Sequence, residues 1–277
     1  MTIDPPPPVD RQLLEDLAAQ VRSSRKYRGI DIPTATLHDL LHQELERRPT
    51  QQAAMHAVRE KLHNIVAPYL GDPDYPAARA LIEDAFQSGQ AAEIRAACLK
   101  MLSSHASTRE RIPLLETFYP RLWQITGQPQ VVLDLACGLH PFGLPWMGLD
   151  SQTRYFSYDL HRPRVDLLNH FFGLSGFEPL AYHQDILVRP PEQSADVAFF
   201  FKEAHRFEQR RHGCNRAFWQ ALNVRWLLVS LPASNLTGRR SLVERQRSLV
   251  QTTLADLDWP VTEITYDNEL VFCIQKS

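Results

Sequence analysis

Residues 131–146 read Val-Val-Leu-Asp-Leu-Ala-Cys-Gly-Leu-His-Pro-Phe-Gly-Leu-Pro-Trp: an apolar run ends near Asp134, and a turn around Gly138 follows. The run predicts a buried strand, because parallel strands covered on both faces are apolar throughout. Ligands of open α/β sheets bind where the strands end. Glycine lets the backbone approach such a ligand closely because it has no Cβ. The stretch therefore predicts the first strand of a nucleotide-binding α/β sheet and its ligand loop.

The spacing of this turn narrows the choice of ligand. It does not match G-x-G-x-x-G, so a dinucleotide is not the first expectation. Asp134-x-x-x-Gly138 is a looser form that is used for S-adenosylmethionine (SAM). Because many α/β proteins carry a turn with glycine after a strand, other residues must decide between these readings.

After residue 129, short apolar runs alternate with helical stretches. This alternation predicts a parallel, doubly wound sheet. The last two strands are joined by the short turn Asp267-Asn268, which predicts an antiparallel edge. Seven strands ending in such a hairpin form the Rossmann-like sheet of class I SAM-dependent methyltransferases. The expected strands are Val131–Leu135, Arg154–Tyr158, Pro179–His183, Asp196–Phe201, Trp226–Leu231, Val261–Tyr266 and Leu270–Gln275.

The first hundred residues instead show the spacing of amphipathic helices. One helix is expected around Leu13–Val21 and another after Pro33, with Thr34 or Thr36 as its cap. Three more are expected at 51–69, 77–88 and 91–103. We therefore predict a disordered tail over 1–8, an all-helical domain over 9–104 and the α/β domain over 105–277.

Composition excludes several classes of protein. No apolar run approaches the roughly 20 residues that span a membrane, and the acidic, proline-rich start does not resemble a signal peptide. The four cysteines are scattered without C-x-x-C pairs, which argues against a zinc site and a disulfide framework. We expect a cytoplasmic protein without a bound metal. The cysteines are Cys98, Cys137, Cys214 and Cys273.

The net charge of −2 conceals an uneven distribution. The segment from Lys202 to Arg247 holds ten Lys or Arg residues and three Asp or Glu residues. A solvated helix face is the simplest interpretation. The segment also lies beside the expected ligand end of the sheet, where a basic face suits a polyanion such as RNA.

Two acidic residues end the second and third predicted strands. Asp159 follows Phe156-Ser-Tyr, where a carboxylate can accept both hydrogen bonds of a ribose diol. Asp185 follows His183-Gln, where the carboxylate of this fold usually meets the adenine amino group. Either residue could instead cap the helix that follows it.

Residues 105–113, His-Ala-Ser-Thr-Arg-Glu-Arg-Ile-Pro, are dense in polar groups. A capping box is one interpretation, with Ser107 or Thr108 opposite Glu110. It does not explain two arginines at this junction. An arginine here could bind the methionine carboxylate of SAM in bidentate fashion.

The strand ends lack the motifs of two methyltransferase classes. The fourth strand leads into Lys202-Glu-Ala-His rather than Asn/Asp-Pro-Pro-aromatic, the motif used for exocyclic amines. The fifth ends in Ser230-Leu-Pro-Ala, without the cysteine nucleophile of C5-pyrimidine methyltransferases. Both absences favour an acceptor that is already nucleophilic, such as guanine N7.

Several stretches together make the chain resemble a known family, the aminoglycoside-resistance 16S rRNA methyltransferases that modify N7 of guanine 1405. The matching stretches are Ser24–Arg28, His105–Pro113, Asp134–Pro141, Pro145–Gly148 and Asn268–Lys276. The resemblance implies a helical domain that docks on the 30S subunit, followed by a SAM-binding domain. It also implies transfer of a methyl group from SAM, and aminoglycoside resistance. We expect a monomer.

The resemblance also implies roles for individual residues. Arg111 would hold the SAM carboxylate, and Gly138 would line its methionine end. Asp159 would bind the ribose. Lys202 and Arg239 would position the target nucleotide, with no general base. The adenine would contact Asp185 and Ile186, Asn215 would add an amide to the cofactor pocket, and rRNA would be contacted by Arg22, Arg25, Lys26, Arg28 and Arg240.

The chain departs from the family on the acceptor side. A Leu-Pro-containing run of the family is replaced by Glu203-Ala-His-Arg-Phe, and Pro-Thr-Lys-Ser by Pro232-Ala-Ser-Asn. Two alternatives therefore stay open: a SAM methyltransferase with another rRNA base or a small molecule as acceptor, and a non-catalytic rRNA-binding paralogue. Trp146 is a candidate for stacking on the target base, or a core aromatic.

Overall fold

The computed structural model describes residues 10–28, 31–66, 72–234, 241–266 and 268–276. The predicted tail over 1–8 lies outside these ranges. The chain divides into two compact units. Unit 1 comprises Met1–Gly71 with Leu160–Arg162, and unit 2 comprises Asp72–Asp159 with Pro163–Ser277.

Unit 1 contains three of the predicted helices: α1 (Arg11–Ser23), α2 (Thr34–Arg47) and α3 (Gln51–Val66). Their apolar stripes share one core, to which Leu17, Leu40 and Val58 contribute fully buried side chains. Burial of one stripe per helix is what holds together helices of this length, since isolated helices this short are marginal in water.

The predicted cap of α2 was wrong. The N-cap residue is Pro33, without a side-chain hydrogen bond, and Thr34 is already the first helical residue. The hydroxyl of Thr34 accepts a hydrogen bond from Arg22, while Thr36 is buried. Proline fixes φ near the value that the chain needs on entering the helix, so backbone geometry takes the place of a capping hydroxyl.

Helices α4 (Tyr75–Gln87) and α5 (Ala91–Ser104) belong to unit 2. The division between the units falls at Gly71–Asp72, whereas the sequence predicts a boundary after residue 104. Ile82 of α4 and Met101 of α5 lie in the same core cluster as Val132 of the sheet. Their apolar faces are therefore buried on the α/β domain.

Unit 2 is built on one seven-stranded sheet with the order β3-β2-β1-β4-β5-β7-β6. Strand β7 is antiparallel to both of its neighbours, and the other neighbouring pairs are parallel. The predicted seven-stranded sheet with an antiparallel edge is confirmed. The strands are β1 (Val131–Leu135), β2 (Arg154–Asp159), β3 (Ala181–His183), β4 (Ala195–Phe201), β5 (Val224–Pro232), β6 (Val261–Thr265) and β7 (Glu269–Gln275).

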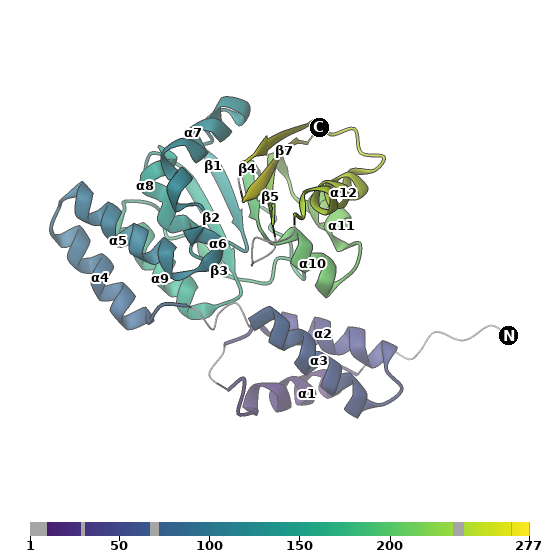
Figure 1. The fold of residues 1–277 in the computed structure, drawn as a ribbon. Coiled ribbons are helices and arrows are strands. Elements are labelled where there is room, and N and C mark those ends of the chain that lie inside the picture. Colours follow the sequence, from purple (N-terminus) through teal and green to yellow (C-terminus); the bar gives the residue numbers. More distant parts are fainter. Residues whose placement is uncertain (1–9, 29–30, 67–71, 235–240, 267, 277) are drawn as a thin grey trace. The chain divides into compact units, whose positions relative to one another are not determined.

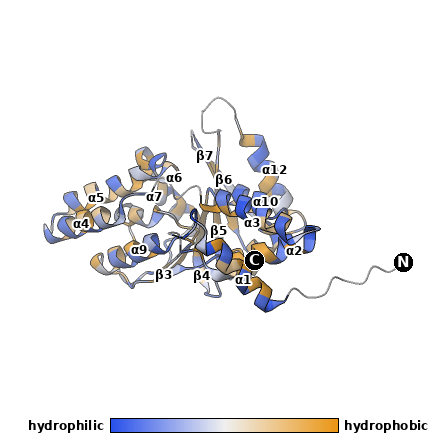
Figure 2. Ribbon diagram, turned by 90° about the horizontal axis from the view of Figure 1, so that it is seen from below, coloured by the Kyte–Doolittle hydropathy of each residue, from blue (hydrophilic) through white to orange (hydrophobic). Residues whose placement is uncertain are grey.

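Helices cover both faces of this sheet (Figure 1). Successive side chains of β1 point to opposite faces, so Val132 joins one core cluster and Leu133 the other. The helices are coloured in alternating blue and orange in Figure 2, as expected of amphipathic helices with one buried side. The first face carries α7 (Leu115–Thr126), α8 (Leu144–Met147) and α9 (Arg162–Leu174), and the second α10 (Ala204–Arg210), α11 (Cys214–Ala221) and α12 (Val243–Leu254).

Three short elements complete unit 2: α6 (Ala106–Arg109), η2 (Ile112–Leu114) and η3 (His140–Gly143). Elements α6 and η2 lie on either side of Arg111 in the chain, and η3 follows Gly138. Across the described ranges of both units, no helix has the length and apolarity that crossing a membrane requires.

Candidate active site

The turn after β1 meets the end of β2. Gly138 has a φ of +57°, in the left-handed region that favours glycine. Its backbone N–H donates to Oδ2 of Asp159, at 3.0 Å. The structure thus brings together Gly138 and Asp159, the two residues expected to bind the methionine end and the ribose of SAM.

Asp159 is also bound by Arg164 of α9. Nη1 of Arg164 lies 2.9 Å from Oδ2 of Asp159, and Nη2 lies 2.5 Å from Oδ1 of Asp72. Helix α9 begins only at Arg162, so Asp159 is not its cap. A carboxylate in this position, at the end of β2, can also accept hydrogen bonds from a ribose diol.

Asp185, at the end of β3, is buried and paired. Arg210 of α10 places Nη1 2.9 Å from Oδ1 and Nη2 2.7 Å from Oδ2 of this carboxylate. The backbone N–H of Leu187 also donates to Oδ1, so Asp185 organises the turn that holds the buried Ile186. An adenine amino group that bonded to Asp185 would share this carboxylate with Arg210.

Arg111 lies within a buried cluster of charges at the ends of β4 and β5. Its Nη2 is 2.5 Å from Oε1 of Glu269, and its Nε is 3.3 Å from Oε2. Lys202 lies 3.9 Å from Glu269 and 2.5 Å from Glu110. Glu269 pairs in register with Pro232, the last residue of β5. The cluster is therefore at the carboxyl edge of the parallel strands.

The guanidinium of Arg111 is enclosed between two aromatic rings. Its Cζ lies 4.5 Å from the ring centre of Phe118 and 4.4 Å from that of Phe201. Burial alone would lower the pKa of Arg111, but the adjacent Glu269 carboxylate raises it. Burial works to raise the pKa of Glu269, yet Arg111 and Lys202 hold it below its usual range. Both partners are therefore charged.

Lys202 adopts an unusual backbone conformation. It follows β4 with a φ of +59°, and its N–H donates to the carbonyl of Ser230 at 2.8 Å. Few non-glycine residues occupy the left-handed region, and those that do concentrate at functional sites. The conformation turns the side chain back toward Glu110 and Glu269.

Asn215 lies apart from these residues. Its amide nitrogen donates to the carbonyl of Ala204 and to Oε1 of Glu208, both at 2.8 Å, and so links α11 to α10. Its Oδ1 is buried and has no hydrogen-bond partner among the residues that the structure describes.

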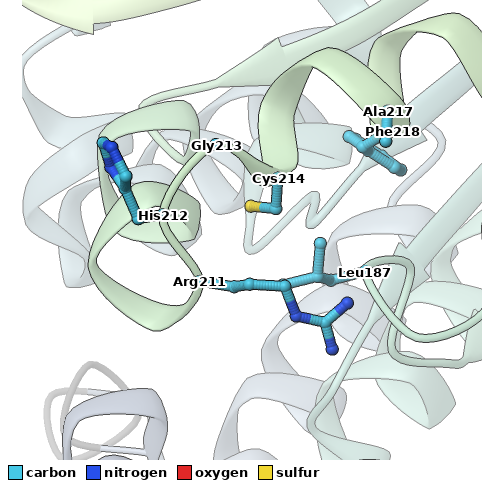
Figure 3. Close-up of a pocket in the computed structure, with 7 residues that line it drawn as sticks. All are labelled: Leu187, Arg211, His212, Gly213, Cys214, Ala217 and Phe218. Carbon is cyan, nitrogen blue, oxygen red and sulfur yellow. The ribbon is translucent and has the colours of Figure 1, made fainter. Parts of the chain in front are cut away.

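A pocket of about 290 Å³ opens beside the start of α11. Figure 3 shows its lining, with Cys214 at the start of α11 and Leu187 and Arg211 on the segments beside it. The pocket is lined by Leu187, Arg211, His212, Gly213, Cys214, Ala217 and Phe218. It does not include the expected contacts for ribose or carboxylate.

The remaining predicted residues divide into three groups. Arg239 and Arg240 lie outside the described residues. Arg25, Lys26 and Arg28 are exposed in the turn after α1, and Arg22 bonds to Thr34. Trp146 is a core aromatic, because it packs in the main core cluster and its indole N–H donates to Glu116 at 2.9 Å.

The structure adds three charged residues that the sequence interpretation did not single out: Arg164, Arg210 and Glu269. The only feature of the sequence that could have pointed to Glu269 is its place as an acid at the start of an apolar run. The two arginines stand in helices where a charged residue ordinarily faces water. Only tertiary structure shows that they neutralise Asp159 and Asp185.

Comparison with known proteins identifies the family to which the chain belongs. The profile of the ribosomal RNA methyltransferase (FmrO) family matches residues 22–273. A 16S rRNA (guanine(1405)-N(7))-methyltransferase from Serratia marcescens is 30% identical over 265 residues, covering 95% of this chain and 99% of the relative. The corresponding protein from Frankia casuarinae is 29% identical over 271 residues, covering 96% and 94%.

Solved structures agree with the sequence comparisons. The 16S rRNA methyltransferase RmtF, in complex with S-adenosyl-L-homocysteine, superposes with a TM-score of 0.76 at 27% identity and covers 97% of this chain and all of its own. The 16S rRNA methylase RmtB gives 0.75 at 26%, covering 95% and 98%. The fold is that of class I SAM methyltransferases, and the chain belongs to the ribosomal RNA methyltransferase (FmrO) family.

Proposed function

We propose that this protein transfers the methyl group of SAM to N7 of guanine 1405 in 16S rRNA. The observation that carries the proposal is the convergence of Gly138, Asp159, Asp185 and Arg111 on one edge of the sheet. Each follows or packs against the carboxyl end of a parallel strand, where this fold binds its ligand. The names of the full-length relatives support the choice of acceptor.

The chemistry of these residues fits the parts of SAM. Asp159 supplies a carboxylate for the ribose hydroxyls, and Gly138 a tight turn whose φ of +57° favours glycine. Asp185, with the buried Ile186, lies at the end of β3 for the adenine. Arg111 supplies a guanidinium for the methionine carboxylate. When bound, the cofactor supplies an activated methyl group on a sulfonium centre.

The protein's own residues have little proton chemistry to perform. Guanine N7 carries a lone pair and no proton, so no general base is needed. Acceleration would come from holding the acceptor in line with the methyl group, which removes the entropy cost of their encounter. Lys202 and Arg239 would hold the target nucleotide. Displacing a base from its stack costs a few kcal/mol, which these contacts would offset.

The 30S subunit is the proposed partner. The exposed cations Arg25, Lys26 and Arg28, together with Arg22 and Arg240, would contact rRNA phosphates. Such contacts release counterions and weaken with salt. Action on ribosomes would place the protein in the cytoplasm.

The decisive experiment maps the modified base. Purified 30S subunits are incubated with the protein, with and without SAM, and the rRNA is treated with borohydride and aniline, which cleave at 7-methylguanine. Primer extension is expected to stop at position 1405 only in the sample with SAM. Methyl incorporation from labelled SAM without this stop would establish another acceptor. Binding of SAM and 30S subunits without incorporation would establish a non-catalytic protein.

A further inference from the structure

A buried polar relay connects the turn after β1 with Arg111. It begins at Asp134 of β1, whose Oδ2 lies 2.8 Å from Nδ1 of His140 and accepts a hydrogen bond from the hydroxyl of Tyr155 at 2.9 Å. The relay continues from Nε2 of His140 to the hydroxyl of Tyr119, at 3.0 Å. All four side chains are almost completely buried. None of them is needed to explain the site described above.

The partners favour one direction for each hydrogen bond. The Asp134 carboxylate only accepts, so Nδ1 of His140 donates to it. We assign to His140 the tautomer that carries its proton on Nδ1, in which Nε2 accepts from the Tyr119 hydroxyl. Burial raises the pKa of Tyr119 and of Tyr155 above the ordinary value, which keeps both hydroxyls protonated.

The Tyr119 hydroxyl also interacts with Arg111. The ring centre of Tyr119 lies 5.2 Å from that of Phe118, and Phe118 packs on the guanidinium of Arg111. With its proton on the bond to His140, the hydroxyl oxygen can accept from this guanidinium, whose pKa the tyrosine helps to raise. The hydroxyl is confined by Gly143, where an added Cβ would lie 2.4 Å from its oxygen. Backbone therefore confines the hydroxyl, and only glycine leaves room for it.

Two aromatic contacts also hold the His140 ring in place. Its centre lies 5.1 Å from that of Phe199 and 5.0 Å from that of Phe201, both edge to face. Phe201 also stacks on Arg111. The turn that carries Gly138 and the guanidinium at Arg111 thus share two routes of contact, one polar and one aromatic.

We propose that Tyr119 and His140 are positioning residues that orient Arg111 for the cofactor carboxylate and tie that orientation to the Gly138 turn. The inference rests on the proposed function, in which Arg111 binds this carboxylate. Glu269 anchors the guanidinium from one side, and Tyr119 supplies the second point that defines its plane. A bidentate contact depends on that plane.

The test compares two single-hydroxyl deletions by calorimetric binding without RNA. Tyr119→Phe and Tyr155→Phe each remove one buried hydroxyl from the relay, but only the first removes a contact with Arg111. We expect Tyr119→Phe to weaken SAM binding about tenfold, the loss of roughly one charge-assisted hydrogen bond. Tyr155→Phe is expected to stay within about twofold of the unaltered protein.

Methylthioadenosine, which keeps the nucleoside but lacks the amino-acid part, provides an internal control. Tyr119→Phe should leave its affinity unchanged, whereas a general loss of folded protein would weaken both ligands equally. Arg111→Ala should show the same ligand selectivity as Tyr119→Phe, with a larger effect.

Three outcomes overturn the proposal: equal SAM affinity in Tyr119→Phe and the unaltered protein, equal weakening of both ligands, or equal weakening in both tyrosine variants. Failure of the proposed function is a separate observation, since it is read from 30S modification. If Tyr119→Phe weakens SAM binding selectively while the unaltered protein leaves guanine 1405 unmodified, this inference stands and the proposed acceptor is wrong.

Discussion

Lys202 affects the protein in two ways, through its strained backbone conformation and through the ion pairs of its ammonium group. Its φ of +59° costs an L-residue about 1 kcal/mol, and its ammonium pairs with Glu110 and Glu269. We expect Lys202→Gly to unfold at higher urea than Lys202→Ala, because glycine accepts this conformation without strain. Both variants should bind SAM and lose methyl transfer to 30S subunits. Equal stability of the two variants would contradict the strain argument, and full transfer by either would remove Lys202 from target binding.

A second prediction concerns Arg239, to which the family resemblance assigns the target nucleotide. Arg239→Ala should keep SAM affinity and lose transfer, because it removes a cation from the acceptor and none from the cofactor. Arg225→Ala is the matched control: this exposed arginine stands at the amino end of β5, whereas the candidate cofactor residues lie at the carboxyl edge of the parallel strands. Full activity of Arg239→Ala in the 30S assay would show that this assignment is wrong.

At the scale of elements, helix α2 depends on one buried acid. Glu44 is almost fully buried and lies 2.7 Å from Lys61 of α3 and 2.9 Å from Arg48. Burial works to raise the pKa of Glu44, but these two cations lower it overall. A carboxylate with a depressed folded pKa stabilises the fold above its usual pKa, and that stability is lost as the pH falls through the folded value.

Glu44→Gln should therefore cost about 1 kcal/mol at pH 7, a value discounted because both cations are partly exposed. The difference from the unaltered protein should shrink as the pH falls below about 4.3, the usual glutamate pKa. Urea unfolding at pH 7 and pH 3 measures it. Glu46→Gln is the control, since the exposed Glu46 pairs with the exposed His42 and should change stability by less than about 0.5 kcal/mol at either pH. A gap for Glu44→Gln that is constant with pH would contradict the linkage.

The same scale shows what local sequence can predict. All seven strands were located to within two residues. The buried ones, such as β1 and β7, were found because an apolar run predicts a strand whatever surrounds it. The cap of α2 was missed because Pro33 replaced a side-chain hydrogen bond with backbone geometry. The pairing of Arg111 with Glu269 joins residues 158 positions apart, and no spacing rule reaches that far.

At the scale of the whole molecule, the proposed cofactor contacts and most of the proposed rRNA phosphate contacts lie in different units. Asp159, Asp185 and Arg111 belong to unit 2, whereas Arg25 and Arg28 belong to unit 1. Removing cations from unit 1 is therefore expected to weaken 30S binding and leave SAM affinity unchanged. The variant Arg25→Ala/Arg28→Ala, measured across a salt series, tests this separation.

The expected magnitude follows from counterion release. Losing two phosphate contacts should reduce the slope of log K against log salt by about 1.5 to 2, and the loss in affinity should be greatest at low salt. The double variant Arg11→Ala/Arg47→Ala removes the same charge from other exposed positions of unit 1. Equal effects of the two double variants would mean that net charge, rather than the turn after α1, attracts the ribosome. A salt slope that falls only in Arg25→Ala/Arg28→Ala would assign the phosphate contacts to that turn.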